Sequence, residues 1–192
     1  MAFDVDGSRL RPAEAADLPP ITRIYGHHVA TGLGSFEEVP PSLEEMARRF
    51  EAVRRQGLPY LVAEVAGAVA GYAYAGPFRP RPAYRHTVED SVYIDPAFAG
   101  RGLGRALVAE LIEACTRLGY RQMVAVIGDS GNLGSIRLHE SLGFRRAGVL
   151  VAVGFKLGRW VDSVLMQRAL GEGDGRPPGA SPGYHQASNW AP

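Results

Sequence analysis

Apolar residues recur every three or four positions in some stretches of the chain and alternate with polar residues in others, which predicts helices and strands respectively. The clearest helical stretch runs from about residue 103 to residue 118, where Leu103, Leu107 and Leu111 share one face. Gly119 ends this helix, because glycine readily adopts the left-handed conformation that follows a helix. A helix of this length packs its apolar face against a sheet, so strands are expected beside it.

The remaining pattern predicts a mixed α/β sheet. Ser42 with Glu45 forms a capping box that starts one helix, and Asp17 is expected to cap another. In chain order, the other predicted elements are a strand at 9–12, helices from 18 and from 42 to about 56, a hairpin of 60–65 and 68–77, a central strand at 87–94, a strand at 123–127, a helix beginning near 132, and two last strands near 147–154 and 163–170.

Composition narrows the class of partner. A chain of 192 residues suits one domain, and its net charge of +1 gives no electrostatic reason to expect nucleic acid or an anionic membrane as a partner. The N-terminus shows no basic region followed by an apolar core, so a cytoplasmic location is expected. The most apolar stretch, residues 60–78, is broken by Glu64 and several glycines and is predicted to form two strands rather than a membrane span. A small molecule is therefore the expected partner.

The composition changes after Leu170. Residues 171–192 contain five glycines and four prolines without apolar periodicity, which predicts a disordered tail behind a domain of residues 8–170. Tyr184, His185 and Trp190 in this tail are consistent with either a partner contact or a frayed terminus.

A glycine-rich basic turn lies between the central strand and the helix at 103–118. Gly100, Gly102 and Gly104 let the backbone turn tightly and aim successive N–H groups at one point, and the helix adds the positive end of its dipole. Such a turn either cradles a phosphate or simply connects strand and helix. Arg105 and Leu107 stand where a dinucleotide fingerprint needs glycine, and no Gly-Lys-Ser/Thr completes a P-loop.

The segment 132–144 decides between these readings. Together with the glycine turn, its opening Asn132 and its closing Gly143-Phe144 resemble the GNAT superfamily of N-acetyltransferases. The resemblance implies acetyl-CoA as the acyl donor, with its pyrophosphate on the turn and its pantetheine arm beside the helix that begins near Asn132. The residues that it assigns to acetyl-CoA are Val92, Tyr93, Ile94, Gly100, Arg101, Gly102, Leu103, Gly104, Arg105, Asn132 and Ser135.

Further blocks, from about Arg9 to Leu170, narrow the resemblance. The runs 75–79, 87–89 and 154–160 are similar to those of phosphinothricin acetyltransferases and their methionine sulfone or sulfoximine acetyltransferase relatives. This implies a mostly antiparallel sheet of about seven strands flanked by about four helices, a homodimer, and neighbouring strands at Ala73 and Val92 that splay apart at the acetyl-CoA cleft. The chain departs from the family at Ala99, where Arg or Gln is usual, and at Gly26, where Asn is common.

Acetyl transfer needs a base for the attacking amine and a donor to the thioester oxygen. The resemblance assigns the first role to Glu89 and the second to the backbone N–H of Tyr93; as a simpler alternative, Glu89 is a strand carboxylate paired with an arginine. His139 stands where many superfamily members carry a tyrosine that protonates the leaving thiolate, and an imidazole suits that role near neutral pH. A histidine hydrogen-bonded only to structure is the other reading.

Arg79 and Arg81 follow the hairpin, and their guanidinium groups suit an α-carboxylate unless the loop is simply a solvated basic one. Phe36 and Tyr84 are expected to wall the substrate pocket, with Trp160 as a further candidate, although aromatic residues often only pack. Cys115 lies on an apolar helix face, so direct transfer is preferred to an acetyl-cysteine intermediate.

No metal is expected. His27 and His28 are adjacent, and no second histidine stands four positions after His139. The sequence therefore predicts acetyl transfer from acetyl-CoA to the α-amine of a small amino-acid-like substrate in a ternary complex. Acetylation of a protein N-terminus or a polyamine, or a non-catalytic acyl-CoA sensor, are the alternatives.

Overall fold

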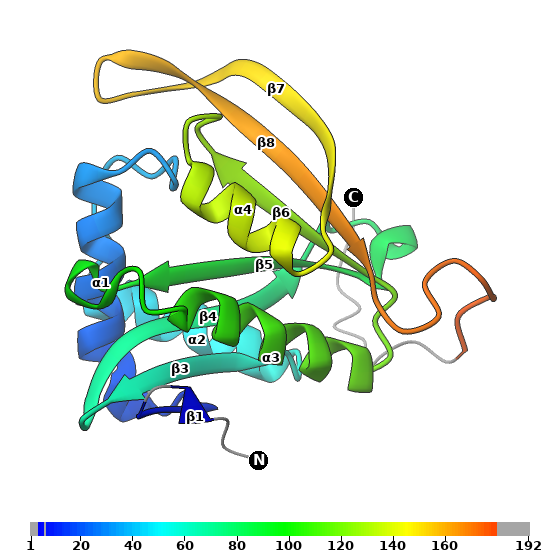
Figure 1. Cartoon of the computed structure of the whole chain (residues 1–192), viewed down its shortest axis with the longest axis horizontal. Helices are drawn as coiled ribbons and strands as arrows, with labels where there is room; N and C mark the ends of the chain where they lie inside the picture. Colours follow the sequence, from blue (N-terminus) through cyan, green and yellow to red (C-terminus); the bar gives the residue numbers. More distant parts are fainter. Residues whose placement is uncertain (1–3, 6, 180–192) are drawn as a thin grey trace.

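The computed structural model describes residues 4–5 and 7–179, which are organised around one eight-stranded sheet in the order β1-β2-β3-β4-β5-β6-β8-β7 (Figure 1). All neighbouring strands are antiparallel except β5 and β6, which are parallel. The strands are β1 (Asp4–Val5), β2 (Ser8–Pro12), β3 (Tyr60–Val65), β4 (Ala68–Pro77), β5 (Thr87–Ile94), β6 (Gln122–Gly128), β7 (Arg145–Lys156) and β8 (Arg159–Ala169).

Four α-helices cover the two faces of this sheet. The helices α1 (Leu18–Thr31) and α2 (Leu43–Arg55) pack on each other and on β4, whereas α3 (Leu103–Arg117) packs on β3, β4 and β5. The helix α4 (Leu133–Ser141) lies beside α3 and β6, in front of the sheet in Figure 1. A mixed, mostly antiparallel sheet with four helices is the fold that the resemblance implied.

The local signals in the sequence account for most element boundaries. The predicted strands at 60–65, 68–77 and 87–94 agree with β3, β4 and β5. Ser42 caps α2 as predicted, because its side chain accepts a hydrogen bond from the Glu45 N–H at 3.1 Å. Asp17 precedes α1 but does not cap it with its side chain; that carboxylate instead binds Arg11 at 2.7 Å.

The last hairpin is longer than predicted. The expected strand ends at 154 and 163 are wrong, since β7 continues to Lys156 and β8 begins at Arg159. Leu157 and Gly158 both have positive φ, 50° and 75°, which is the geometry of the tight turn that matches the twist of a two-stranded ribbon. The sequence analysis missed this turn because leucine is an unusual residue in the left-handed conformation.

The sheet opens at a different pair of strands from the pair expected. Ala73 and Val92 are neighbours as predicted, but β4 and β5 stay paired from Gly71↔Ile94 to Pro77↔Val88. The splay predicted between them is therefore wrong. The opening lies between β5 and β6, whose pairing runs only from Thr87↔Gln122 to Asp90↔Ala125 although both strands continue.

Beyond β8 the described chain continues through turns, in which the Gly173 N–H donates to the Leu170 carbonyl at 2.9 Å and Glu172 pairs with Arg121 at 3.3 Å. The predictions for residues 180–192, including Tyr184, His185 and Trp190, lie outside the described residues. Within residues 4–5 and 7–179, every helix is too short or too polar to cross a membrane.

Candidate active site

A cleft of about 830 Å³ occupies the opening between β5 and β6. The facing strand segments 91–94 and 126–128 form its sides, and the start of α3 and the first turns of α4 close its ends. These two strand segments do not pair with each other, and His28 Nε2 lies 2.8 Å from the Ile94 carbonyl oxygen, but Val92 still turns its N–H and carbonyl toward the opening, where they suit an extended chain carrying amides. The cleft therefore suits a long, partly peptide-like ligand.

The glycine turn stands at one end of this cleft. Gly100 and Gly102 have φ of 77° and 78°, so both positions favour glycine. Gly102 is the N-cap of α3, and the first N–H groups of a helix have no partner within it. This backbone geometry is compatible with the predicted anion cradle, which stays a prediction.

Gly104 lines the cleft and also has a packing reason to be glycine. It lies inside α3, where an added Cβ would come within 2.9 Å of Leu138 Cδ1, so it permits α3 and α4 to approach. Arg105 lines the cleft, whereas Arg101 lies outside the lining with its guanidinium 5.2 Å from the Phe98 ring centre.

The backbone of β5 places the N–H of Tyr93 away from the cleft. The Asp95 N–H donates to the Ala70 carbonyl at 2.9 Å, and at the other end the Phe78 N–H donates to the Thr87 carbonyl at 3.5 Å. Because backbone groups alternate sides along a strand, the N–H groups of the odd-numbered residues, Tyr93 included, face β4. The expectation that Tyr93 donates to the thioester oxygen is corrected: Val92 has the first N–H beyond the β5–β6 pairing that faces the opening.

Two neighbouring carboxylates project from opposite faces of β5. Asp90 lines the cleft on the side of α3 and α4, whereas Glu89 projects to the side of α1 and α2 and is not part of the cleft lining. Burial and the charge of Asp90 raise the pKa of Glu89, and Arg79 only partly opposes them. A carboxylate with a raised pKa is a better base near neutral pH than an ordinary glutamate.

Tyrosines form a cluster beside Glu89 that sequence reasoning did not identify. Tyr60 stacks on Tyr74 with ring centres 5.0 Å apart, and Tyr72 stacks on Tyr93 at 5.4 Å. The edge of Tyr25 from α1 meets Tyr93 at 4.9 Å. The strand register produces this cluster, because the four strand tyrosines occupy paired positions on one face of β3, β4 and β5.

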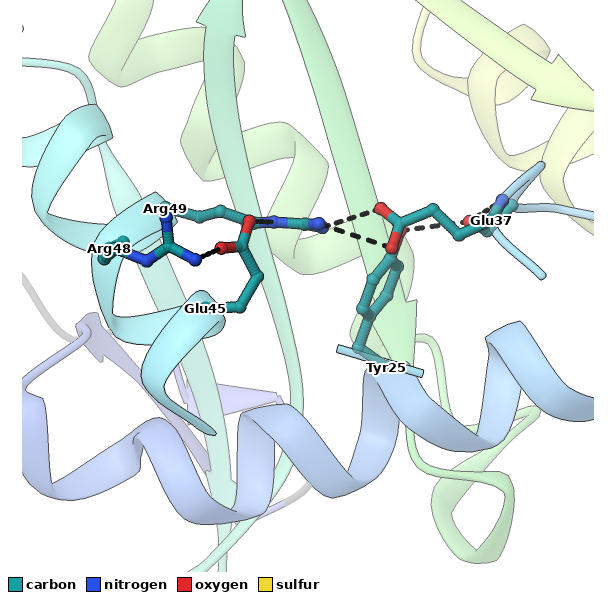
Figure 2. A network of polar contacts seen from close by, with 6 residues as sticks. Tyr25, Glu37, Glu45, Arg48 and Arg49 are labelled. Atoms are coloured by element: carbon teal, nitrogen blue, oxygen red, sulfur yellow. Dashed lines mark hydrogen bonds and ion pairs between the residues drawn. The ribbon is translucent and has the colours of Figure 1, made fainter. Parts of the chain in front are cut away.

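Glu37 holds the loop between α1 and α2 on the face of the sheet that carries these tyrosines. Figure 2 shows Glu37 between two helices: Tyr25 of α1 donates to its carboxylate at 2.8 Å, and Arg49 of α2 binds it at 2.6 Å. Arg49 also binds Glu45 at 2.6 Å, and Glu45 pairs in turn with Arg48. The loop is thereby tied to both helices on the α1–α2 side of the sheet.

The same loop is held to β7 by Lys156. Its buried ammonium donates to the Ser35 carbonyl at 2.6 Å, and burial lowers the pKa of Lys156. Gly128 and Gly154 make room for the loop, since a Cβ on Gly128 would lie 2.2 Å from the Leu33 carbonyl oxygen and one on Gly154 would lie 2.5 Å from the Phe36 ring.

The other predicted substrate residues, Phe36, Arg79, Arg81 and Tyr84, are exposed. Arg79 stacks on Phe78 at 4.9 Å, and the Tyr84 ring meets Phe78 edge-on at 5.6 Å. Arg81 is exposed at the start of the short turn Pro82–Tyr84. Of the two arginines, Arg79 is the one whose charge lowers the pKa of Glu89.

His139 is buried in the wall of the cleft, and both of its ring nitrogens are engaged. Nδ1 lies 2.8 Å from the Ser135 carbonyl oxygen, and Nε2 lies 3.0 Å from Asp90 Oδ2. No ring N–H is left over for a leaving thiolate, so the geometry favours the structural reading of this histidine. Cys115 is also buried, and burial together with the Asp90 charge raises the pKa of its thiol to about 12, which leaves it a poor nucleophile.

The structure brings most of the expected cosubstrate residues to one cleft and leaves the expected acceptor residues outside its lining. Asn132 caps α4, because its side chain accepts from the Ser135 N–H at 3.2 Å. The predicted residues that line the cleft are Val92, Tyr93, Ile94, Gly100, Gly102, Leu103, Gly104, Arg105, Asn132, Ser135 and His139. Those outside its lining are Phe36, Arg79, Arg81, Tyr84, Glu89 and Arg101.

Comparisons with known proteins give a consistent result. Residues 26–144 match the acetyltransferase (GNAT) family. The chain is 58% identical over 158 residues to the phosphinothricin N-acetyltransferase of Alcaligenes faecalis, covering 82% of this chain and 80% of the relative. It is 42% identical over 163 residues to the L-methionine sulfoximine/L-methionine sulfone acetyltransferase of Salmonella typhimurium, covering 85% and 95%. A phosphinothricin acetyltransferase from Sinorhizobium meliloti, solved in complex with AcCoA, superposes with a TM-score of 0.88 at 51% identity over 91% of this chain and 94% of that chain.

Proposed function

Because the chain belongs to the acetyltransferase (GNAT) family, it is an acetyl-CoA-dependent N-acetyltransferase, and we propose that its acceptor is the α-amine of a small amino-acid-like substrate. The relatives are named for phosphinothricin and for methionine sulfoximine and sulfone, and an acceptor of that type is the one proposed here. The observation that carries the proposal is the position of Glu89: a carboxylate with a raised pKa lies across β5 from the cleft that suits acetyl-CoA.

For the acetyl donor, the proposed contacts are mostly backbone groups. The N–H groups of the turn 100–105 bind the pyrophosphate at the start of α3, and Arg101 and Arg105 supply positive charge where Ala99 contributes none. Asn132 and Ser135 border the pantetheine arm, and the N–H of Val92 polarises the thioester carbonyl.

Transfer then proceeds by direct attack. Glu89 takes a proton from the acceptor ammonium or amine, and the amine nitrogen attacks the carbonyl carbon from the α1–α2 side. The CoA thiolate leaves and is protonated by water. A thiol with a pKa of about 8.5 is a good leaving group near neutral pH, so this step needs no protein acid.

For the acceptor, Arg79 and Arg81 bind the α-carboxylate and Phe36 and Tyr84 wall the pocket. Charge-assisted hydrogen bonds are worth about 1.5–3 kcal/mol each, so Arg79→Ala or Arg81→Ala should raise KM for an amino acid about ten- to a hundredfold. A decarboxylated analogue of the same amino acid should be a poor substrate for the wild type and should lose little more in either variant.

Measuring both substrates on wild type and variants gives a double cycle. Coupling between removal of the arginine and removal of the carboxylate supports the proposal. Independent effects would discard the carboxylate clamp and favour the alternative acceptors, a protein N-terminus or a polyamine.

We also propose a homodimer, supported by the last hairpin. β7 is an edge strand of twelve residues, and such an edge is normally covered. Exposed apolar side chains gather on the hairpin, at Val149, Leu150, Val151, Val153, Phe155, Leu157 and Trp160. Light scattering should give twice the monomer mass for the wild type and the monomer mass for a Phe155→Ser, Trp160→Ser double variant; a monomeric wild type would contradict the dimer.

A cytoplasmic location is proposed as well, because acetyl-CoA is available there. Cell fractionation that recovers the protein with a cytoplasmic marker would support it, and recovery outside the cytoplasm would contradict it.

A further inference from the structure

A buried pair of ionisable side chains links β5 to α4 across the wall of the cleft. Asp90 and His139 have side chains that are 1% and 2% exposed, and His139 Nε2 lies 3.0 Å from Asp90 Oδ2. The other oxygen of Asp90 has no hydrogen-bond partner within the described part of the chain. The specific polar contact of Asp90 is therefore made entirely with His139.

The partners of His139 determine where its protons are. The Ser135 carbonyl oxygen at 2.8 Å from Nδ1 can only accept, so Nδ1 carries a proton. An ionised Asp90 can also only accept, so Nε2 opposite it carries the second proton. The arrangement is thus that of an imidazolium between a carboxylate and a helix carbonyl, and a buried carboxylate needs such a cation beside it.

The surroundings agree with this protonation state. Burial lowers the pKa of His139, whereas the hydrogen bond and the charge of Asp90 and the hydrogen bond to the Ser135 carbonyl raise it, and the net shift is upward. Glu89, next to Asp90 on β5, and Cys115 on α3 are titratable neighbours of the pair and are not cations. The cations Arg105 and Arg137 line the same cleft, but neither binds Asp90. The edge of the Phe144 ring covers His139 at 4.9 Å between ring centres.

We propose that Asp90 is a positioning residue, which holds His139 as a permanent imidazolium and through it fixes the first turns of α4 against β5. The Ser135 carbonyl accepts a hydrogen bond from Nδ1 of His139, and Asn132 caps the helix. Both residues border the proposed pantetheine site. Glu89, the proposed base, is the residue next to Asp90. The pair therefore sets the distance between the acetyl donor and the base without itself transferring a proton.

The protonation state is tested directly on the wild-type protein by nitrogen-15 NMR of the histidine rings. Both ring nitrogens of His139 should carry a proton at pH 8, with resonances assigned by their absence in His139→Gln. A single ring N–H at pH 7, or a titration near the ordinary histidine value of about 6.5, would overturn the proposal.

The positioning role is tested by kinetics. Asp90→Asn and His139→Gln should each lower kcat about 10- to 100-fold, because moving the acetyl donor relative to the base by about 1 Å costs this much. KM for the amine should change less than about threefold. The double variant should lose no more than the worse single variant, since both changes break one contact. Glu140→Gln, an exposed neighbour of His139, is the matched control and should stay within about twofold of wild type.

The shape of the pH profile separates positioning from proton transfer. Asp90→Asn should keep an acid limb of kcat that belongs to Glu89, moved to lower pH because the charge of Asp90 no longer raises the pKa of Glu89, and should have no limb of its own. Wild-type kcat in Asp90→Asn, or losses that multiply in the double variant, would contradict the positioning role.

The kinetic arm rests on the proposed function, whereas the NMR arm does not. If the wild type transfers acetyl to no amine, the proposed function fails and the ring protons still decide whether the pair exists. If His139→Gln does not fold, the His139 resonances are assigned in the wild type by their proximity to the Phe144 ring, and the NMR result decides alone.

Discussion

Glu89 is the residue on which the proposed chemistry depends most. Its charge is not needed to bind acetyl-CoA, because Glu89 is not among the residues that line the cleft. Glu89→Gln should therefore lower kcat about 10²–10⁴-fold, the range for loss of a general base, with little change in acetyl-CoA affinity. Steady-state kinetics and calorimetric titration on the same preparation measure both. Near-normal turnover would transfer the role to water or another residue.

The raised pKa of Glu89 predicts a pH dependence. Only the ionised carboxylate accepts a proton, so kcat should fall as pH decreases through a value above the ordinary glutamate value of about 4.3. Two acceptor amines with different pKa values provide the control, because the limb that belongs to Glu89 stays in place when the amine is changed. The limb should be absent from the residual activity of Glu89→Gln; a limb that remains there would assign it to another group.

Single residues also mark how far the sequence could be interpreted. The resemblance identified Glu89 as the candidate base, and the glycine pattern located the turn at Gly100 and Gly102. The sequence could not reveal which way the Tyr93 N–H points, since that depends on which residues of β5 form hydrogen bonds with β4. Asp90 carried no signal either, because its partner His139 is 49 positions away in the chain.

At the scale of elements, Gly128 tests how the loop before α2 closes the cleft. A Cβ at this position would lie 2.2 Å from the Leu33 carbonyl oxygen, a backbone atom that cannot move aside alone. Gly128→Ala should displace residues 33–34, which line the cleft, cost about 1–3 kcal/mol of unfolding free energy and raise KM for acetyl-CoA. Urea unfolding and kinetics measure both effects.

Gly148→Ala is the control for Gly128→Ala, because an added Cβ there meets nothing within 4 Å. It should leave both quantities nearly unchanged. A Gly128→Ala protein as stable and as active as this control would show that the loop is not held in the described position.

The pattern of apolar residues predicted where most helices and strands lie but not which strands pair. The apolar stretch at 60–78 predicted β3 and β4 because both strands are buried on both faces over most of their length. The extended ends of β7 and β8 were missed because residues on that hairpin are exposed, so no burial pattern marks them. Glu37 of the loop binds Tyr25 of α1 and Arg49 of α2 (Figure 2). Contacts of this kind join residues of different elements, so the local sequence does not predict them.

At the scale of the whole molecule, the opening between β5 and β6 organises the function. β5 still pairs with β4 and β6 still pairs with β8 beyond the last contact between them, so each half of the sheet remains rigid on either side of the cleft. In the proposed mechanism the donor binds in this opening beside α3 and α4, and the acceptor approaches from the side of Glu89. The family resemblance supplied the expectation of a splay, and only the three-dimensional pairing identified the strands that form it.

The central claim is acetyl transfer to an amino-acid-like amine, and release of CoA from acetyl-CoA measures it most directly. The test compares wild type and Glu89→Gln on phosphinothricin, methionine sulfoximine and methionine sulfone, with spermidine, a peptide with a free N-terminus and an amine-free blank alongside. We expect amine-dependent release by the wild type, with kcat/KM at least about 10²-fold higher for the amino acids than for spermidine or the peptide, because a site built for a carboxylate rejects an acceptor that lacks one. Release with spermidine or the peptide alone, or binding of acetyl-CoA without release for any amine, would contradict the account.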